Sequence, residues 1–597
     1  MIGAPLRTPL RPLASILSAR EKGENPDLIE AENLRRRHEE MRDRDRLRAE
    51  TRLTVLGLGF LAAFAVVGGK MTEMAASPPF EPREDGYTTT IQAQRADIVD
   101  RNGNVLATNL ITNSLYAQPP LMIDKAAAAK GLAAVFPEMK ADDLLRRFSS
   151  GSKFIWLKRK ISPEQMQAVH DIGEPGLLFG PREMRLYPNG QLAAHVLGGA
   201  GFGREGVHAA EIIGVAGVEH RFDEYLRDPA RQGAPLQLSI DLTVQAATRR
   251  VLYGGMKLMN AKGAAAVLMD VRSGEILSLV SLPDFDPNDR PRPLTSGDAS
   301  DSPLFNRAAQ GLYELGSTFK IFTAALAMDQ GIATPDTMID ISGPLVWGKY
   351  RIRDFHNYGK ALSLTDVIVK SSNIGTARLA GAIGGGKQQT FLDSIGLFAP
   401  SGVELPEAAN ARPLLPPRWS ELSTMTISYG HGLAASPLHL ATAYASLLNG
   451  GTRVEPTLLK TPAPSQGKRI ISEAVSVELR KMLRQVVVRG TASMAEVKGY
   501  QVGGKTGTAD KPKPGGGYYD KKVIATFAGI FPAHDPKYVL VVTLDEPEDT
   551  SGPEPRRTAG WTTVPVAAEI IRRAAPLLGM RPEIESPDGM NYTLSKY

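Results

Sequence analysis

The sequence YELGSTFK at residues 313–320 places Ser317 three residues before Lys320, at the start of an apolar helical pattern that continues to Met328. Residues three apart on a helix share a face, so we expect the Lys320 amine to reach the Ser317 hydroxyl. The first turn of a helix also presents free backbone N–H groups, which stabilise negative charge on oxygen. Burial and a second cation nearby would lower the pKa of Lys320, so that its amine can accept a proton at neutral pH. The segment therefore predicts a nucleophilic serine with a lysine base.

A serine three residues before a lysine is a weak signal by itself. The same spacing recurs at residues 150–153 and 465–468, where neighbouring glycine, serine or proline would not hold the pair on a helix. Considered alone, the pattern at Ser317 is more often a simple helix cap that precedes a solvated lysine. The prediction of a nucleophile therefore depends on two further motifs.

The second motif is Ser371-Ser372-Asn373, which follows the apolar helical pattern of residues 364–369. The Ser371 hydroxyl can relay a proton between Lys320 and a leaving amine. The Asn373 side chain offers both a donor and an acceptor to a peptide backbone. Without the other motifs, this segment would indicate only a helix terminus with capping residues.

The third motif is the sequence KTGT at residues 505–508, which follows two glycines at the expected edge of a strand. A strand edge can pair with an extended peptide, and Gly507 lets another backbone approach closely. Lys505 and the hydroxyls of Thr506 and Thr508 can hold a terminal carboxylate by charge-assisted hydrogen bonds.

An oxyanion hole would complete such a site, and the backbone N–H groups of Ser317 and Thr508 are the candidates for it. The loss of one oxyanion-hole donor raises the activation free energy by about 3 kcal/mol. The three motifs would then supply a nucleophile with its base, a proton relay and a carboxylate-binding strand.

Together and in this order, the three motifs resemble the signature that penicillin-binding proteins share with serine β-lactamases. Over roughly residues 50–575 the chain resembles a class B penicillin-binding protein, of the cell-division (septal) D,D-transpeptidase type. Three segments resemble the motifs of that family's N-terminal pedestal, namely residues 95–103, 185–190 and 217–219. Ala96 stands where glycine is usual and Leu315 where proline is frequent, and neither departure touches a catalytic group.

The resemblance implies a penicillin-binding transpeptidase fold and a serine-type D-Ala-D-Ala transpeptidase activity. Ser317 would attack the carbonyl of the penultimate D-alanine of a peptidoglycan stem peptide and release the terminal D-alanine. An amine of a neighbouring stem would then take the acyl group, and β-lactams would acylate Ser317 because they mimic D-Ala-D-Ala. The family implies a membrane glycan polymerase and other divisome proteins as partners, and it implies no metal or nucleotide cofactor.

Three alternatives stay open at this point. An elongation-type transpeptidase would use the same chemistry with other partners. A D,D-carboxypeptidase or β-lactamase would need a placed water, and the chain lacks the separate glutamate motif that is typical of class A β-lactamases. A penicillin-sensing receptor or an inactive scaffold is disfavoured by the intact motifs and by the single anchor described below.

The pattern of elements predicts an α+β fold for the C-terminal part. The expected elements are a strand at 236–240, a helix at 242–260, a hairpin over 264–282, a mostly helical middle at 305–450, strands at 501–503, 523–531 and 538–544, and a closing helix at 563–574. Strands at both ends around a helical middle indicate an antiparallel sheet packed by helices.

Residues 72–234 show no catalytic set, and we expect an elongated mixed α/β pedestal that serves interactions. Asn102-Gly103 is a turn signal there, and Ser162 followed by a proline and Gln165 predicts a capped helix start. We therefore expect five parts: a cytoplasmic tail at 1–52, an anchor at 53–71, a pedestal at 72–234, a transpeptidase domain at 235–580 and a C-terminal tail at 581–597.

Residues 53–69 form an uncharged apolar run between Arg52 and Lys70. As a helix this run would extend about 25 Å, and the flanking basic residues can snorkel to complete a hydrocarbon core of about 30 Å. A buried helix would keep a polar face, and a cleaved signal peptide would rarely follow so many polar residues. Eight arginines lie within residues 35–52 and two basic residues within 70–83, so the positive-inside rule places the N-terminus in the cytoplasm. We expect a single-pass inner-membrane protein with a periplasmic catalytic domain, and the resemblance implies the division site.

The composition excludes several other classes of function. The chain of 597 residues has no cysteine, which excludes disulfides, thiolate metal sites and cysteine catalysis. Its net charge of +6 is small for its length, and the dense arginines near the N-terminus alternate with acidic residues. Nucleic-acid binding is therefore not expected.

Overall fold

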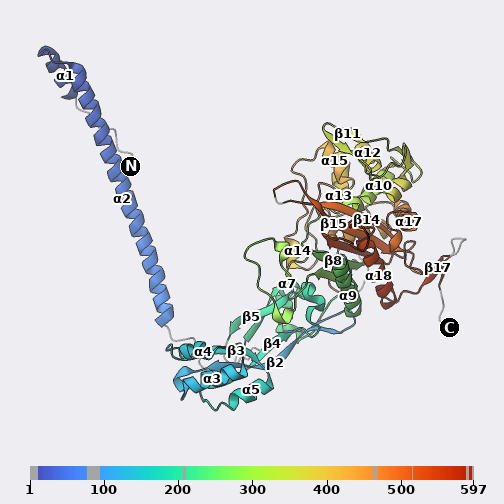
Figure 1. Ribbon diagram of the computed structural model, residues 1–597, viewed down its shortest axis with the longest axis horizontal. Coiled ribbons are helices and arrows are strands. Elements are labelled where there is room, and N and C mark those ends of the chain that lie inside the picture. The colour runs from blue at the N-terminus through green and yellow to red at the C-terminus, as the bar shows by residue number, and fades with distance from the viewer. Residues whose placement is uncertain are drawn as a thin grey trace. The chain divides into compact units, whose positions relative to one another are not determined.

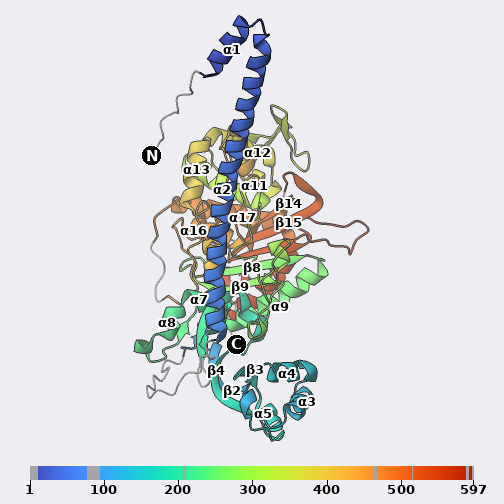
Figure 2. The ribbon, with the colours of Figure 1, turned by 90° about the vertical axis from the view of Figure 1, so that its left-hand side faces the viewer.

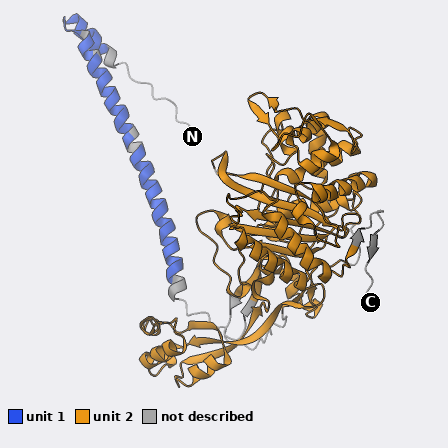
Figure 3. Ribbon diagram, turned by 45° about the vertical axis from the view of Figure 1, so that its right-hand side comes forward, with its two compact units in different colours: residues 1–84 blue, residues 85–597 orange. Residues whose placement is uncertain are grey.

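The computed structural model describes residues 11–76, 95–205, 210–461, 467–513, 515–585 and 591–593. The chain has two compact units, residues 1–84 and 85–597, which Figure 3 shows in blue and orange. Residues 77–94 at the start of the predicted pedestal, Ser465 of the serine–lysine spacing at 465–468 and part of the predicted C-terminal tail lie outside the described residues.

The described part of the first unit consists of helices α1 (Arg11–Glu21) and α2 (Pro26–Ala76), shown in blue in Figure 1. α2 contains the predicted membrane span and ends beyond it. Among the described residues it is the one helix that is long and apolar enough to cross a membrane, and its apolar stretch is not buried. Before that stretch, the ion pairs Arg36–Glu32 and Arg46–Glu50 join residues one turn apart and support the helix.

The N-terminal part of the second unit is built on a five-stranded sheet in the order β3-β2-β1-β7, with β4 paired to β2. The strands are β1 (Ile98–Val99), β2 (Val105–Ala117), β3 (Ile155–Ile161), β4 (Leu177–Leu186) and β7 (Leu236–Gln237). Figure 2 shows three helices clustered beside β2 and β3: α3 (Lys125–Val135), α4 (Ala141–Phe148) and α5 (Pro163–His170). Their apolar faces form a separate small core around Leu132, Phe136 and Phe148. The turn predicted at Asn102-Gly103 and the capping box of Ser162 and Gln165 are both present.

A buried ion cluster joins the three pedestal segments that the sequence singled out. The Glu219 carboxylate accepts hydrogen bonds from Arg95 Nε at 2.7 Å and from Arg185 Nε at 2.6 Å. The Arg95 guanidinium also pairs with Asp223 at 2.6 Å, and Tyr187 donates to Glu219 at 3.3 Å. The cluster lies beside a ribbon and three short helices, namely β5 (Gly199–Glu205), β6 (Ala210–Ala216), α6 (Ala194–Leu197), α7 (Gly217–Arg221) and α8 (Asp223–Arg227). Buried charges of opposite sign hold one another in place here, because each would be costly to bury alone.

The C-terminal part is built on a five-stranded antiparallel sheet in the order β14-β15-β16-β8-β9. The strands are β8 (Gly263–Asp270), β9 (Ile276–Leu282), β14 (Gly503–Pro512), β15 (Tyr518–Phe531) and β16 (Tyr538–Asp545). The predicted hairpin and the strands predicted at 523–531 and 538–544 are confirmed. The strand predicted at 501–503 begins only at Gly503 and continues through the third motif as β14, and the strand predicted at 236–240 is paired as a strand only at its first two residues. Residues of β8 on both faces are buried, so helices must cover both sides of the sheet.

Helices cover this sheet, as Figure 1 shows, and confirm the predicted α+β layering. α9 (Leu242–Leu258) and the closing helix α18 (Thr563–Leu577) pack on each other and on the sheet, while α16 (Pro437–Leu448) and α17 (Glu473–Arg489) also contact its strands. The helical middle contains α10 (Lys320–Asp329), α11 (Leu364–Lys370), α12 (Asn373–Ile383), α13 (Gly385–Ser394), α14 (Pro406–Ala409) and α15 (Glu421–Ile427). Short strands complete the fold: β10 (Met338–Asp340) with β13 (Ala361–Ser363), β11 (Leu345–Trp347) with β12 (Tyr350–Ile352), and β17 (Glu583–Glu585) with β18 (Asn591–Thr593).

Candidate active site

Ser317 lies in a tight 3₁₀ turn, Gly316–Phe319, from which α10 begins at Lys320. The sequence predicted that the α-helix would start at residue 318, two residues earlier than it does. Gly316 has a φ of 57°, and a Cβ there would lie 3.0 Å from the backbone nitrogen of Thr508. A Cβ on Gly507 would lie 2.2 Å from the carbonyl oxygen of Leu315. Glycines on both sides therefore let β14 pack directly against the turn that carries Ser317.

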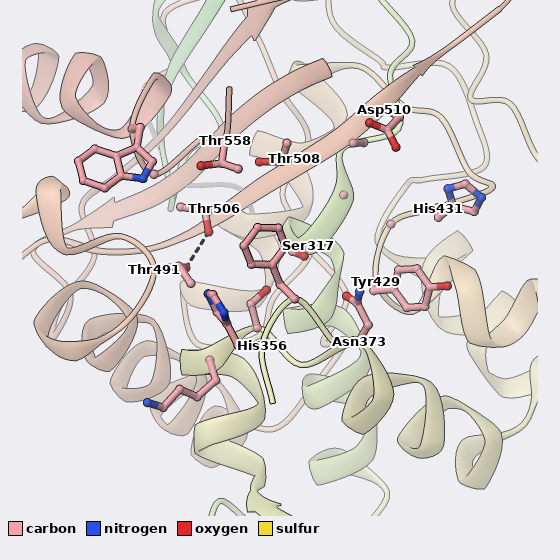
Figure 4. Close-up of a pocket in the computed structure, with 18 of the residues that line it drawn as sticks. Ser317, His356, Asn373, Tyr429, His431, Thr491, Thr506, Thr508, Asp510 and Thr558 are labelled. Carbon is pink, nitrogen blue, oxygen red and sulfur yellow. Dashed lines mark hydrogen bonds between the residues drawn. The ribbon is translucent and has the colours of Figure 1, made fainter. Parts of the chain in front are cut away.

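The three motifs line one cavity of about 640 Å³, shown in Figure 4. The predicted residues in its wall are Ser317, Ser371, Asn373, Thr506 and Thr508. Lys320 and Lys505 are fully buried just behind this wall, and both reach it through Ser371. Segments more than a hundred residues apart in the sequence thus meet around one serine.

The two lysines converge on a single hydroxyl. Lys320 Nζ donates to Ser371 Oγ at 3.0 Å and also to the Ser371 carbonyl oxygen, while Lys505 Nζ donates to Ser371 Oγ at 2.9 Å. The two donated bonds occupy both lone pairs of this oxygen, so the Ser371 O–H is left to donate elsewhere. The direct contact expected between Lys320 and Ser317 is not among the hydrogen bonds of the described residues. A buried ammonium needs acceptors, and Ser371 gives Lys320 two of them.

Both lysines are chemically unusual because they are buried. Burial, reinforced by the charge of Lys505, holds the pKa of Lys320 well below its ordinary value. Burial lowers the pKa of Lys505 to about 7. Desolvation and like charge both disfavour the ammonium form, so these amines can exchange protons near neutral pH.

Ser371 adopts a strained backbone conformation that aims its side chain. It ends α11 with a φ of 62°, in the left-handed region that non-glycine residues seldom adopt. Asp354 braces the next residues, because its carboxylate accepts from Ser372 Oγ and from the Asn373 backbone N–H, both at 2.6 Å. Asn373 Nδ2 in turn donates to the Arg353 carbonyl oxygen at 3.0 Å. Local strain of this kind persists only where the surrounding contacts hold it.

Residues 264–572, just over half of the chain, match the family described as penicillin binding protein transpeptidase domain. The chain belongs to this family. Residues 90–231 match the family described as penicillin-binding protein dimerisation domain. The resemblance inferred from the three motifs is thereby confirmed.

Individual relatives agree with this assignment. The chain is 37% identical over 511 residues to the probable peptidoglycan D,D-transpeptidase FtsI of Caulobacter vibrioides, covering 84% of each chain. It is 32% identical over 480 residues to the probable peptidoglycan D,D-transpeptidase PenA of Neisseria gonorrhoeae, covering 77% of this chain and 81% of the relative. The crystal structure of penicillin binding protein 3 from Mycobacterium tuberculosis, complexed with aztreonam, matches with a TM-score of 0.60 and 26% identity, covering 82% of this chain and 96% of that one.

Several residues in and around this cavity were not singled out as site residues in the sequence. The carboxylate of Glu314 joins three segments: it accepts from the Gly432 N–H at 2.8 Å and from the Tyr518 hydroxyl at 3.2 Å, and it pairs with His431 at 3.2 Å. The hydrogen bond that His431 donates to the Glu314 carboxylate raises the pKa of His431. Burial, with the charge of Glu314, raises the pKa of Tyr429 to about 12. Tyr429 and His431 both line the cavity (Figure 4).

Strand β14, which carries the third motif, has hydrogen-bond partners that the sequence did not reveal. Thr506 Oγ1 lies 2.7 Å from Thr491 Oγ1, the pair joined by the dashed line in Figure 4. Thr508 Oγ1 accepts from the Ala559 N–H at 3.0 Å. Among the described residues, no group of three or more histidine or carboxylate side chains has a geometry that could hold a metal ion.

Proposed function

We propose that this protein is a peptidoglycan D,D-transpeptidase that cross-links stem peptides through an acyl-enzyme on Ser317. The observation that carries the proposal is the convergence of the Lys320 and Lys505 amines on Ser371 Oγ, beside Ser317 in one cavity. Membership of the transpeptidase family and the names of both relatives support the same activity.

In the acylation step, Ser317 Oγ attacks the carbonyl carbon of the penultimate D-alanine and forms an ester. The hydroxyl proton passes to the Lys320 amine, which is available as a base because burial lowers its pKa. The bond to the terminal D-alanine breaks, and the leaving nitrogen takes a proton through the free O–H of Ser371. That route is supported by the two lysine donors already bound to the Ser371 oxygen.

Two further groups have roles in the same step. The backbone N–H groups of Ser317 and Thr508 would bind the developing oxyanion, which is supported by the close packing of β14 on the serine turn. Lys505, Thr506 and Thr508 would bind the terminal carboxylate, while Gly507 lets β14 pack on the turn that carries Ser317. A bound carboxylate favours the protonated form of Lys505, so substrate binding would restore the charge that burial weakens.

In the second step, an amine of a neighbouring stem peptide attacks the ester and regenerates Ser317. A hydrolase of the carboxypeptidase or β-lactamase type would need a base that activates water at the ester. Among the described residues that line the cavity, the one carboxylate is Asp510, an exposed residue two positions beyond Thr508 on β14. This arrangement disfavours a hydrolase that activates water with a carboxylate, as class A β-lactamases do.

We further propose that cross-linking takes place at the septum during cell division. The name of the Caulobacter relative and the motif resemblance favour this role over the elongation-type alternative. The anchor in α2 and the arginines before it support a single-pass inner-membrane protein with a cytoplasmic N-terminus. Partners would then be a membrane glycan polymerase and other divisome proteins.

The domain limits proposed at 72–234 and 235–580 are supported by the two family matches, which fall within them.

The proposal is tested by labelling membranes with fluorescent penicillin. The wild type is expected to be labelled stably and Ser317→Ala not at all. Labelling that persists in Ser317→Ala would refute the nucleophile, and rapid loss of label from the wild type would indicate a β-lactamase.

The cell-division role is tested by depletion of the protein from cells. Depletion is expected to give filamentous cells, and round cells would indicate the elongation type.

A further inference from the structure

A surface of cations and aromatic rings lies on the hairpin β11–β12 and the loop that follows it, near the α12 and α15 labels in Figure 1. We call it the hairpin surface and define it as Trp347, Lys349, Tyr350, Arg351, Phe355 and Lys360. Trp347 and Tyr350 are register partners across the hairpin, and the Lys349 amine lies 5.5 Å from the centre of the Tyr350 ring.

The positive charge of this surface is not balanced by nearby acids. Lys349, Arg351 and Lys360 are exposed, and none of them takes part in an ion pair within the described part of the chain. Residues 345–360 contain one acidic residue, Asp354, whose carboxylate is bound to Ser372 and to the start of α12. The cations of the hairpin surface are therefore available to an anionic partner.

The aromatic side chains of this surface are also uncovered. Phe355 is 83% exposed, Tyr350 51% and Trp347 38%. Trp347 and Tyr350 are register partners, and exposed rings in such a pair are unusual on a soluble surface and indicate a contact with a ligand or partner. Rings combined with cations fit a partner that has both flat apolar faces and carboxylates.

The hairpin leads along the chain into the wall of the catalytic cavity. Phe355, three residues beyond the end of β12, lines the cavity together with His356 and Tyr358. His356 and Ser317 both line the cavity (Figure 4). A polymer whose stem peptide occupies the cavity can therefore extend across this wall onto the hairpin.

We propose that the hairpin surface binds the peptidoglycan strand beyond the reacting dipeptide, with the cations on stem-peptide carboxylates and the rings against sugar faces. This inference rests on the proposed transpeptidase function and adds a recognition site to it. Peptidoglycan strands carry free carboxylates along a chain of sugars, so both their charge and their apolar faces match the surface. A small β-lactam reacts inside the cavity and does not extend over the hairpin, so it reports on the catalytic site alone.

The test compares Lys349→Gln/Arg351→Gln/Lys360→Gln with a control, Lys257→Gln/Lys498→Gln/Lys537→Gln, that removes the same charge from exposed positions elsewhere in the catalytic part. The full-length proteins are titrated with soluble, uncross-linked peptidoglycan strands at low and high salt, and Ser317 is labelled with fluorescent penicillin. The hairpin variant is expected to bind strands about tenfold more weakly at low salt, to lose most of the salt dependence, and to label at the wild-type rate. Tyr350→Leu, which keeps the charge, is expected to weaken binding at both salt concentrations.

Strand binding by the hairpin variant that equals that of the control would overturn the inference. A loss of labelling in proportion to the loss of strand binding would also overturn it, because the defect would then lie in the cavity. If the hairpin variant loses binding to anionic lipid vesicles but binds strands as the wild type does, the surface is assigned to the membrane instead. A wild type that is neither labelled nor able to cross-link would refute the proposed function itself, which is a separate outcome.

Discussion

Lys320 Nζ lies 3.0 Å from Ser371 Oγ, so the amine next to the nucleophile in sequence is bound to a serine from another motif. The contact links the nucleophile turn to the end of α11. Lys505 approaches the same oxygen from β14 at 2.9 Å. Three segments therefore share one hydroxyl, and the site depends on all of them folding together.

Removal of this shared hydroxyl is the first prediction. Ser371→Ala takes an acceptor from both buried lysines and removes the proposed proton relay. General acid–base groups contribute about 10²–10⁴-fold to rate, and we expect the acylation rate constant with penicillin to fall within that range. Stopped-flow acylation measures it. Thr491→Ala removes a cavity hydroxyl that touches neither lysine and is expected to lose far less. Equal losses in the two variants would contradict the relay.

The pH dependence of acylation follows from the two lysine pKa values. Lys505 has a pKa of about 7, so its positive charge is lost as the pH rises through that value, and carboxylate binding weakens. Lys320 must be neutral to act as a base, so its contribution is lost as the pH falls through its lowered pKa. The second-order acylation constant is therefore expected to pass through a maximum, with a decline on the alkaline side that appears in KM. A constant that keeps rising well above neutral pH would contradict the assigned role of Lys505.

Asp354 is predicted to be a positioning residue for the second motif. Asp354→Asn keeps the size of the side chain but removes the charge that accepts from Ser372 and from the Asn373 N–H. The loss of such a cap costs about 1 kcal/mol, and we expect acylation to slow about tenfold through displacement of Ser371 and Asn373. Saturation kinetics should show the loss in the limiting rate more than in KM. Asp340→Asn, in an exposed pair with Arg378, is the matched control and should react normally.

The buried ion cluster of the pedestal gives a prediction about stability rather than activity. Glu219→Gln leaves Arg95 and Arg185 buried without their shared carboxylate. Removal of one partner from a buried pair destabilises by about 3–5 kcal/mol, which denaturant unfolding would measure. Glu138→Gln, which breaks an exposed pair with Lys158, is expected to change little. If Glu219→Gln unfolds like the wild type, the cluster does not stabilise the pedestal.

The sequence predicts the elements better than it predicts the contacts between them. The hairpin of β8 and β9, the strands β15 and β16 and the helix α18 follow from local periodicity, and the structure contains them. The start of α10 was placed too early, because the 3₁₀ turn at Gly316–Phe319 has the same composition as a helix start.

The contacts that define the site are tertiary, and local patterns do not encode them. The sequence suggested that Lys320 reaches Ser317, because spacing within one helix is visible, whereas the left-handed backbone of Ser371 is not. Asp354 lies in a segment without any periodic pattern, and Glu314 lies in the stretch 313–320 that contains Ser317, but neither local pattern indicates which distant segments the carboxylate contacts. The motif at 505–508 could be predicted because its glycine and its charge are already informative in sequence.

The assignment of Ser317 as the nucleophile is tested most directly by mass spectrometry of the intact protein after reaction with penicillin, followed by peptide mapping. We expect one adduct with the mass of the whole penicillin, located on Ser317 and absent from Ser317→Ala. An adduct on any other residue, or an adduct of unchanged amount in Ser317→Ala, would contradict it.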